Sequence, residues 1–591
     1  MDVSQDTSLD FRGERDTSAI NRSFRFDRTA GQTGIILFIL ALLIRAIFLF
    51  ITPNNGVDAW ARYMYAIGWL NDPSSLPSGT ANDAWLPFHF WLLGGALWFW
   101  KSEWTARVLT LLLGALTVFP IWALTRKIFG REIALGGTLA LAIFGFHVGY
   151  SVTTSSEVPT ICFLVTSLYC WHRYYLEPSW KWAITSGLLL AAACLTRFEA
   201  WLVPPVLILA LLDYSKGWRS LRSSVQAWRN AVRFAIPASS GVIGWMLFSW
   251  EKWGDPMKLP HRTIAENTSK IAELHHGMGY RLAVVPGALI ISLSPLLAAL
   301  AAVGLIGTIW RGTMLTRSLA CLFLALMTFN YYNSVRHEVT QAKYTLVYSW
   351  LCMPFAFLAV AWITSRWRLC SMRCASSLLV LFFLLWQSAV AVGSIYAPPS
   401  VADRLGVLSV TLPLKTELRG LVAWLKINDP SGTGVILDDY NYEGTDIIRF
   451  SHISPSDTFS VKIHAYHDPD LKNKIAEFVT QHKPRFCICS PDGPIGRALS
   501  LRAQRELQIP SLNVHLIRLW EGVHWAVFSI VPTESGEQAD PSFLLRRYLF
   551  GVSVSTRPGL SGEFTRTPRM SVRKFENISF AATAWSTRST P

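Results

Sequence analysis

Long apolar runs, separated by short polar segments, fill the first two-thirds of the chain. An α-helix needs about 20 mostly apolar residues to cross the ~30 Å hydrocarbon core of a bilayer. Runs of about this length predict spans near 34–52, 104–125, 132–150, 158–175, 181–196, 198–213, 233–251, 284–309, 317–333, 344–364 and 375–396. The pattern therefore predicts a polytopic all-α integral membrane protein with about 11 transmembrane helices.

The apolar run at 86–100, LPFHFWLLGGALWFW, is treated differently because it is short for a crossing and contains His89. We interpret it as a surface-lying or re-entrant helix. The basic loops near 126–131, 173–181, 216–233, 311–317 and 366–373 then all fall on one side with the N-terminus. The positive-inside rule makes that side cytoplasmic. If 86–100 were a span, the later loops would be inverted.

After residue 397 the pattern changes from long apolar runs to short alternating segments. Residues 434–440, 485–490 and 523–531 predict strands, and 414–427 and 470–482 predict amphipathic helices. These elements predict a small external α/β domain. The predicted organisation is a cytoplasmic N-terminal tail at 1–31, a transmembrane catalytic domain at 32–398, the external domain at 399–535 and a flexible basic Ser/Thr-rich tail at 536–591.

Composition supports the membrane assignment and argues against a nucleic-acid partner. Hydrophobic residues make up 51% of the chain and charged residues only 16%, while many of the 26 Trp lie near the ends of apolar runs, as in interfacial aromatic belts. The net charge of +15 is concentrated in short loops and forms no basic stripe on a soluble module. The expected location is the plasma (inner) membrane, with the C-terminal domain external or periplasmic. Cys487 and Cys489 have no nearby partners for a zinc site.

Two acidic residues are the first candidates for chemistry on the external side. Asp58 begins the segment 57–70, where aromatic and aliphatic residues share one helical face and Arg62 follows one turn later. The alternative for Asp58 is a helix N-cap paired with Arg62. Glu157, in SVTTSSEVP, lies at the mouth of the next external loop, where a capping role and a functional acid are equally compatible with the sequence.

The remaining external candidates are basic or aromatic. His89 lies between Trp85 and Trp91, and Arg197 interrupts two apolar runs together with Glu199. The alternatives are an interfacial histidine and an arginine that snorkels to the interface. External positive charge opposes the sidedness of the other loops, so an anionic partner such as a phosphate is expected near it. The residues concerned just outside a late span are Arg336, Lys343 and Tyr344.

This ordered set of residues resembles the GT-C membrane glycosyltransferases, in particular the superfamily of protein mannosyltransferases and lipid A aminoarabinose transferases (PMT/ArnT-like). The resemblance covers about residues 34–400. It implies transfer of a sugar from a polyprenyl-phosphate carrier to an acceptor on the external side, with inversion at the anomeric carbon. It also implies that Asp58 is the acid that acts on the acceptor and that Glu157 is the second-loop acid.

The resemblance assigns the remaining residues with some departures. The Lys-Pro-Pro tract of the family falls on Trp85, Leu86 and Pro87, so its phosphate-binding Lys is absent, and Arg62 or His89 is suggested in its place. The residues that the resemblance assigns to the phosphate or substrate are Arg197 and the basic-Tyr pair Lys343–Tyr344, with Arg336 as a further candidate. Ala59 follows Asp58 where the family often has a second acid.

The predicted function is sugar transfer from a polyprenyl-phosphate-linked lipid donor, with membrane lipids as the surroundings and an unidentified glycan, lipid or protein as acceptor. No cofactor is identified; the external acids are sparse for a metal site, and a divalent metal stays open. The main alternative function is a multi-span transporter or lipid flippase. Such proteins place charges near mid-membrane and often have repeated halves, whereas here the ionisable residues gather at one outer face and no repeat is visible. A non-catalytic binding scaffold and a hydrolase are two further candidates for the function.

Overall fold

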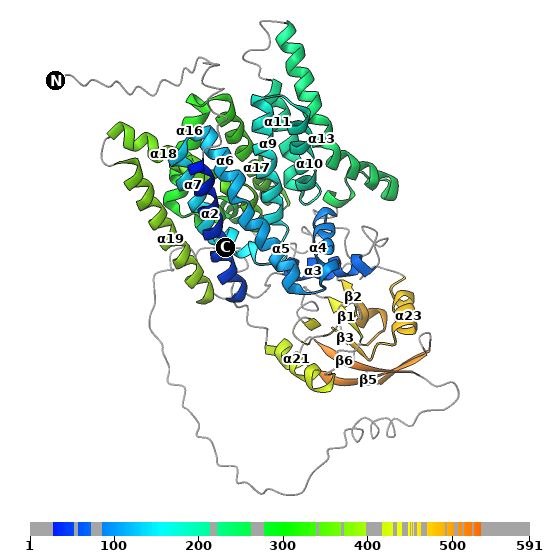
Figure 1. Cartoon of the computed structure of the whole chain (residues 1–591). Coiled ribbons are helices and arrows are strands. Elements are labelled where there is room, and N and C mark those ends of the chain that lie inside the picture. Colours follow the sequence, from blue (N-terminus) through cyan, green and yellow to red (C-terminus); the bar gives the residue numbers. More distant parts are fainter. Residues whose placement is uncertain are drawn as a thin grey trace, which may run out of the picture. The chain divides into compact units, whose positions relative to one another are not determined.

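The structure is a computed structural model of the 591-residue chain. It describes residues 28–51, 57–71, 85–212, 221–261, 277–337, 342–367, 371–396, 416–429, 434–439, 447–448, 451, 453, 458–462, 470–490, 493–501, 506–510, 513–522 and 525–532. The described residues up to 396 form a helical body, and those from 416 carry a β-sheet (Figure 1). Most of the predicted N-terminal tail, the linker at 397–415 and the predicted tail at 536–591 lie outside the described residues.

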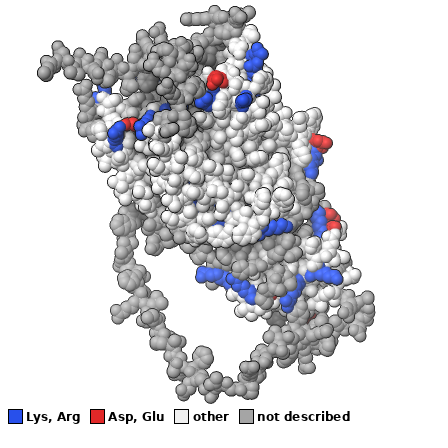
Figure 2. Space-filling model, in the orientation of Figure 1, with Lys and Arg blue, Asp and Glu red and all other residues white. Residues whose placement is uncertain are grey.

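Six helices among the described residues are long and apolar enough to cross a membrane, with the consecutive helices α5 and α6 counted as one. They are α2 (Arg28–Ile51), α5 (Glu103–Leu116) with α6 (Val118–Phe129), α13 (Leu221–Trp253), α17 (Met314–His337), α18 (Leu346–Trp367) and α19 (Met372–Tyr396). On the face shown in Figure 2, the broad middle of the helical body is almost free of charged side chains. This distribution is that of an integral membrane protein.

Two predicted spans are broken into bent helix pairs. The pairs are α7 (Arg131–Ile143) with α8 (Gly145–Ser151), bent by 54°, and α15 (Met278–Leu293) with α16 (Pro295–Arg311), bent by 108°. The sharper break has a local cause, because Ser294 has a φ of 75° and Pro295 starts the next helix. The Ser294 hydroxyl also accepts the backbone N–H of Leu297, which caps α16. Counting each pair as one span raises the number of candidates to eight.

The predicted span at 158–175 corresponds to the 20-residue helix α9 (Glu157–Leu176), which is not among the candidate spans. Two other predicted spans correspond to short helices, α10 (Trp180–Cys194) and η2 (Phe198–Leu202) followed by α11 (Val203–Leu212). With a rise of 1.5 Å per residue, the 15-residue helix α10 is only about 22 Å long. The predicted number of about 11 spans is therefore not confirmed. The 12-residue helix α4 (Phe88–Phe99) is about 18 Å long, in agreement with its exclusion from the predicted spans.

Close packing of the helical body depends on small residues at helix contacts, as is typical inside membranes. Helix α10 packs between α9 and α13, and α16 packs along α18. A Cβ at Gly304 of α16 would collide with the backbone carbonyl of Phe355 in α18, so only glycine permits this approach. The buried side chains of α9, α10, α16, α17 and α18 form one continuous core. This core holds the helix ends that carry the site described below.

The predicted helix at 57–70 is confirmed as α3 (Val57–Asn71), and it packs against α4. Tyr63 and Ile67 are buried in a cluster with Leu93 and Leu97 of α4, which explains the apolar face read from the sequence. The N-terminus of α4 is tied to the end of α10, because the backbone N–H of Phe88 donates to the carbonyl of Leu195 at 3.1 Å. Helices α3 and α4 therefore form one unit attached to the α10–η2 turn.

The C-terminal region contains a six-stranded sheet with helices on both faces, so strands and helices both occur there as predicted. The strands are β1 (Val435–Asp439), β2 (Thr458–Lys462), β3 (Phe486–Cys489), β4 (Glu506–Ile509), β5 (Val514–Glu521) and β6 (Ala526–Pro532), in the order β2-β1-β3-β6-β5-β4. Strand β1 is parallel to β2 and β3, and the other pairs are antiparallel. Three of the six strands, β2, β4 and β5, were missed by the sequence pattern.

Alternating residues of the central strands face two separate apolar clusters. Ile436 and Cys487 lie in the cluster covered by α23 (Leu471–His482), whereas Leu437 and Ile488 lie in the cluster covered by α21 (Thr416–Asn428). A short helix, α24 (Pro494–Ala498), follows β3. Cys487 is thus a small core residue, as the sequence indicates.

Candidate active site

A cavity of about 490 Å³ lies where several helix ends of the helical body meet. Its walls come from α3, from the α10–η2 turn, from the turn after α13, from the end of α17 and from the short helix η3 (Ala342–Thr345). It is lined by Arg62, Trp85, Leu86, Thr196, Arg197, Phe198, Glu199, Trp201, Leu202, Met257, Pro260, His261, Phe329, Asn330, Tyr332, Asn333, His337, Lys343 and Tyr344. Four residues predicted for the site, Arg62, Arg197, Lys343 and Tyr344, are thus brought together from segments far apart in the sequence.

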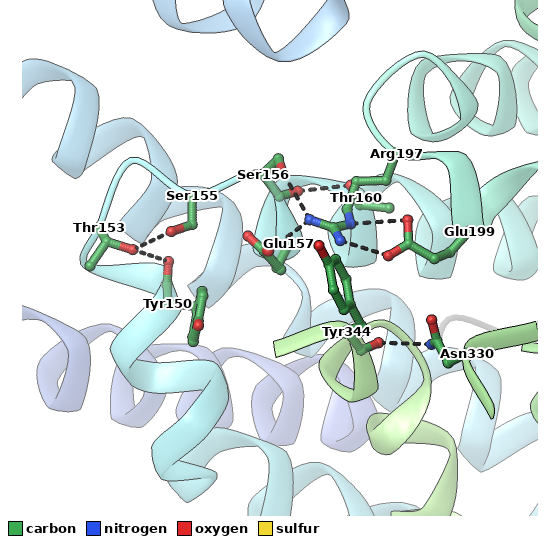
Figure 3. A network of polar contacts seen from close by, with 10 residues as sticks. All are labelled: Tyr150, Thr153, Ser155, Ser156, Glu157, Thr160, Arg197, Glu199, Asn330 and Tyr344. Carbon is green, nitrogen blue, oxygen red and sulfur yellow. Dashed lines mark hydrogen bonds and ion pairs between the residues drawn. The ribbon is translucent and has the colours of Figure 1, made fainter. Parts of the chain in front are cut away.

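The centre of the site is a buried ion network around Arg197 (Figure 3). Its Nη1 lies 2.7 Å from Glu157 Oε1, its Nη2 lies 2.6 Å from Glu199 Oε1, and its Nε donates to Glu199 Oε2 at 3.3 Å. Nη1 also donates to the Ser156 hydroxyl at 3.1 Å. All three charged side chains are less than 10% exposed. Two carboxylates on one guanidinium leave a buried excess of one negative charge at the cavity wall.

The local backbone explains why these side chains meet. Arg197 has extended backbone angles at the junction of α10 and η2, and its side chain bonds Glu199 of η2 and Glu157 of α9. Glu157 is the first residue of α9, after a loop of hydroxyl residues. In that loop Thr153 and Ser155 share a hydrogen bond of 2.8 Å, and Thr160 donates to the Ser156 carbonyl at 2.7 Å (Figure 3). Glu157 therefore presents its carboxylate to Arg197 from the first turn of α9.

The charge state of Arg197 follows from these contacts. Burial by itself lowers the pKa of Arg197, but the carboxylates of Glu199 and Glu157 outweigh burial and raise the pKa above its usual value. The guanidinium is therefore charged at every physiological pH. Its Cζ also lies 5.3 Å from the centre of the Tyr344 ring, which places a cation–π contact at the cavity wall.

Arg62 forms a second cationic point of the cavity. It is 5% exposed, and its Cζ lies 4.3 Å from the centre of the Trp85 ring and 5.8 Å from that of Phe90. Asp58 is the second residue of α3 and lies one helical turn before Arg62. Because residues four apart share a helix face, Asp58 is on the face that carries Arg62. The side chain of Asp58 itself lies outside the described residues.

His89 does not take the position that the sequence suggested. It is fully buried in α4 and is not among the residues that line the cavity. Burial, and then the positive charges of Arg62 and Arg197, hold the pKa of His89 well below its usual value. The ring is therefore neutral near pH 7 and supplies no positive charge for a phosphate. Of the two residues suggested in place of the Lys of the family tract, only Arg62 lines the cavity.

The late basic-Tyr pair lies at the opposite wall. Lys343 and Tyr344 belong to η3, and the Lys343 Nζ is 5.6 Å from the centre of the Tyr344 ring. Asn330 of α17 donates from Nδ2 to the Tyr344 carbonyl at 3.2 Å, which fixes η3 against α17 (Figure 3). Arg336 is exposed near the end of α17 and does not line the cavity, so its predicted role has no support from this geometry.

Several residues of the site were not assigned a role from the sequence. In the sequence, Glu199 is a charged residue between two apolar runs, two positions after Arg197. This position could have identified it as a partner of Arg197. His261 and His337 line the cavity from the turn after α13 and from the end of α17, and neither was assigned a role from the sequence. Within the described parts of the chain, no group of three or more His, Cys, Asp or Glu side chains could hold a metal ion.

Comparison with known proteins bears on this arrangement. Residues 84–245 match the family model described as dolichyl-phosphate-mannose-protein mannosyltransferase. The apo structure of ArnT from Cupriavidus metallidurans has 14% identity and a TM-score of 0.52, over 86% of this chain and 100% of ArnT. The predicted resemblance to the PMT/ArnT-like GT-C superfamily is confirmed. The matched segment contains Trp85, Glu157 and Arg197, so the central ion network lies within it.

Two further structures show the range of the GT-C likeness. ArnT from Cupriavidus metallidurans bound to undecaprenyl phosphate has 13% identity and a TM-score of 0.51, over 85% of this chain and 98% of that one. The oligosaccharyltransferase AglB from Archaeoglobus fulgidus, in complex with an inhibitory peptide and a dolichol-phosphate, has 13% identity and a TM-score of 0.44, over 77% of this chain and 69% of that one. The second TM-score is too low to bear on the site. No curated protein sequence matches the chain.

Proposed function

We propose that the chain is a membrane glycosyltransferase that transfers a sugar from a polyprenyl-phosphate-linked donor to a hydroxyl acceptor at the external face, with inversion. The observation that carries this proposal is the cavity in which Arg62 and Lys343 face a buried Glu157–Arg197–Glu199 network. The GT-C fold supports it, since ArnT, a protein of similar fold, is bound to undecaprenyl phosphate in one of its structures.

The donor phosphate would bind between Arg62 and Lys343. Both side chains line the cavity, and Arg62 is held in place by its stacking on Trp85. A guanidinium can hold two phosphate oxygens at once and keeps its charge, which suits a leaving group that becomes more negative. Arg197 has a different role in this proposal. Its contacts to Glu157, Glu199 and Ser156 occupy four of its donor hydrogens, so it holds the wall of the site.

Asp58 would act as the base for the acceptor. The resemblance assigns this role, and its position one turn before Arg62 puts the acid next to the proposed phosphate site. In the reaction the acceptor oxygen forms a bond to the anomeric carbon as its proton passes to Asp58. The bond between the anomeric carbon and the phosphate oxygen breaks, and its electron pair leaves with the polyprenyl phosphate. A base that is well placed contributes about 100-fold or more to such a step.

The remaining walls are suited to a sugar and a prenyl chain. The rings of Trp85, Trp201, Tyr332 and Tyr344 line the cavity, as do the apolar side chains of Leu86 and Leu202. Aromatic faces pack on the apolar faces of sugars, and their polar edges can bond hydroxyl groups. A lipid-linked sugar needs both kinds of surface at the membrane boundary, which is where the helix ends bring them together.

Asp58→Asn tests the proposal with little effect on folding, because Asn and Asp cap helices about equally well. The wild type and the variant are purified in detergent and incubated with radiolabelled undecaprenyl-phosphate sugars and a membrane extract. We expect turnover by the wild type and a loss of about 100-fold or more in the variant. Asp470→Asn, at the start of α23 in the sheet region, is the matched control and should keep full activity.

Two outcomes would contradict this assignment. Equal turnover by the wild type and Asp58→Asn would make Asp58 a helix cap. Lipid flipping or solute uptake by the wild type in vesicles, with no transfer from any sugar in the panel, would establish the protein as a transporter.

A further inference from the structure

The turn that follows α13 holds a histidine and an aspartate in a fixed geometry. Gly254 has a φ of 69° and ends α13 by donating its N–H to the Trp250 carbonyl at 2.8 Å. Asp255 then uses both carboxylate oxygens. Oδ1 accepts the backbone N–H of Met257 at 2.9 Å, and Oδ2 lies 3.0 Å from Nδ1 of His261. One acid therefore caps the turn and orients an imidazole.

The turn is anchored to the floor of the cavity. Leu259 is fully buried and packs in a cluster with Leu86 and Trp245, against which Leu195 and Phe198 also pack. His261 lines the cavity, and no described residue forms a hydrogen bond with its Nε2. Because Nδ1 contacts Asp255, Nε2 is the ring nitrogen that can contact a ligand.

The ionisable groups around His261 are one carboxylate in contact with its ring and several cationic side chains around the cavity beside it. Hydrogen bonds from His261 and then from Met257 lower the pKa of Asp255, so its carboxylate is ionised at neutral pH. Lys258 is the charged neighbour on the same turn. The other described titratable groups that face the cavity are Arg62, Arg197, Glu199, Tyr332, His337, Lys343 and Tyr344.

We propose that His261 is a further catalytic residue, which donates a proton from Nε2 to the departing phosphate, and that Asp255 is its positioning residue. This proposal rests on the proposed function, because the phosphate is that of the polyprenyl carrier. As the bond from the anomeric carbon to the phosphate oxygen breaks, the phosphate gains a negative charge. The imidazolium gives its proton to a phosphate oxygen and becomes neutral, and the carrier leaves as the hydrogen-phosphate monoanion.

Binding of undecaprenyl phosphate, the free carrier, tests the proposal without knowledge of the sugar. The full-length chain in detergent is titrated with this lipid at pH 6.0 and at pH 8.5, on either side of the range in which histidine titrates. A hydrogen bond between charged groups corresponds to about tenfold in affinity. We therefore expect His261→Gln to weaken binding about tenfold at pH 6.0 and less than about twofold at pH 8.5, because an imidazole donates from both ring nitrogens only when it is protonated.

Asp255→Asn separates the role of the charge from the role of the turn. Asn keeps a side-chain oxygen for the Met257 N–H, so the turn should stay folded. We expect a pH-dependent loss of about threefold in binding, since a neutral amide stabilises the imidazolium less than a carboxylate does. In a transfer assay both variants should lower kcat below pH 7.5 and leave KM for the acceptor unchanged, a split that general loss of structure would not produce.

His515→Gln is the matched control. His515 also lies near a carboxylate, 4.0 Å from Glu506, but it belongs to the sheet region, and this substitution should alter neither binding nor its pH dependence. Equal affinity of the wild type, His261→Gln and Asp255→Asn at both pH values would overturn the role of His261 and leave the proposed function intact. Absence of both lipid binding and transfer in the wild type would instead overturn the proposed function, and this inference with it.

Discussion

Two buried arginines of the helical body show how differently a membrane protein can hold the same charge. Arg197 lies between two carboxylates at the wall of the cavity. Arg45 is fully buried in α2, and all of its described partners are neutral: Nε donates to the Ser151 hydroxyl at 3.2 Å, Nη2 to His147 Nδ1 at 2.7 Å, and Nη1 to the carbonyls of Ala41 and Ala142.

The difference lies in what else surrounds each guanidinium. The contacts of Arg45 join α2 to α7 and α8, and Arg45 does not line the described cavity. The contacts of Arg197 join the first residue of α9 to the α10–η2 turn, and they leave an excess negative charge close to two further cations of the cavity. Burial of an ionisable group therefore does not by itself distinguish Arg197 from Arg45, whereas a position in an ion network at a cavity wall does.

Removal of Arg197 should have the largest effect. Arg197→Met leaves the carboxylates of Glu157 and Glu199 buried without their counter-ion, which costs about 3–5 kcal/mol in the free energy of unfolding. We also expect transfer activity to fall about 100-fold or more, since a wall of the site collapses. Thermal unfolding in detergent and the transfer assay measure the two effects on the same preparation.

A second substitution makes this prediction specific to the ion network. Arg197→Met combined with Glu199→Gln removes one of the two uncompensated charges and should regain part of the lost stability, with activity still absent. Additive losses in the double variant would show that the network contributes through packing alone, which would contradict the electrostatic account.

The same substitution at Arg45 should have a smaller and different effect. Arg45→Met leaves only neutral groups without their donor, so we expect a loss of about 1–3 kcal/mol in stability. Because Arg45 does not line the cavity, activity per folded molecule should stay within about threefold of the wild type. A loss of activity as large as that of Arg197→Met, with the stability retained, would erase the contrast between the two arginines.

The sequence predicted most of the helical body because apolar runs and basic loops report directly on membrane crossing. It missed the break in α15–α16, because the apolar run continues through Ser294 and Pro295 and was predicted as one span at 284–309. The number of spans is not confirmed, because a run such as 181–196 has the composition of a span but forms a helix of only 15 residues. The sequence pattern missed strands β4 and β5 because both carry mixed, partly exposed residues.

The sequence predicted several residues of the candidate site, but not the contacts between them. Arg197 and Glu157 could each be identified as unusual charges, but the 2.7 Å contact between them depends on how the turn after α10 meets the start of α9. His89 was assigned to the phosphate by its neighbours in sequence, whereas its burial in α4 is a property of the packed α3–α4 unit. His261 comes from a turn that the sequence does not connect to the site at all.

The smallest expected effect concerns the buried histidine near each arginine, which is His147 for Arg45 and His89 for Arg197. His147 accepts a hydrogen bond from Arg45, so its Nδ1 carries no proton. His89 is buried near Arg62 and Arg197, and its pKa in the folded state lies well below the value of about 6.5 expected in the unfolded chain. Above pH 6.5 the His89 ring is neutral in both the folded and the unfolded state. As the pH falls below 6.5, only the unfolded state binds a proton at His89, so the free energy of unfolding decreases.

Between pH 6.5 and pH 5.5 this histidine should lower the free energy of unfolding by about 1 kcal/mol. His89→Gln removes the titrating group, so its unfolding temperature should fall less steeply over this interval than that of the wild type. The control is His482→Gln, an exposed position of α23 that should leave the slope unchanged. Equal slopes for the wild type and His89→Gln would mean that the ring is hydrated or protonated in the folded protein. The contrast between Arg197 and Arg45 would then be weaker, because a protonated His89 would add a positive charge close to Arg197.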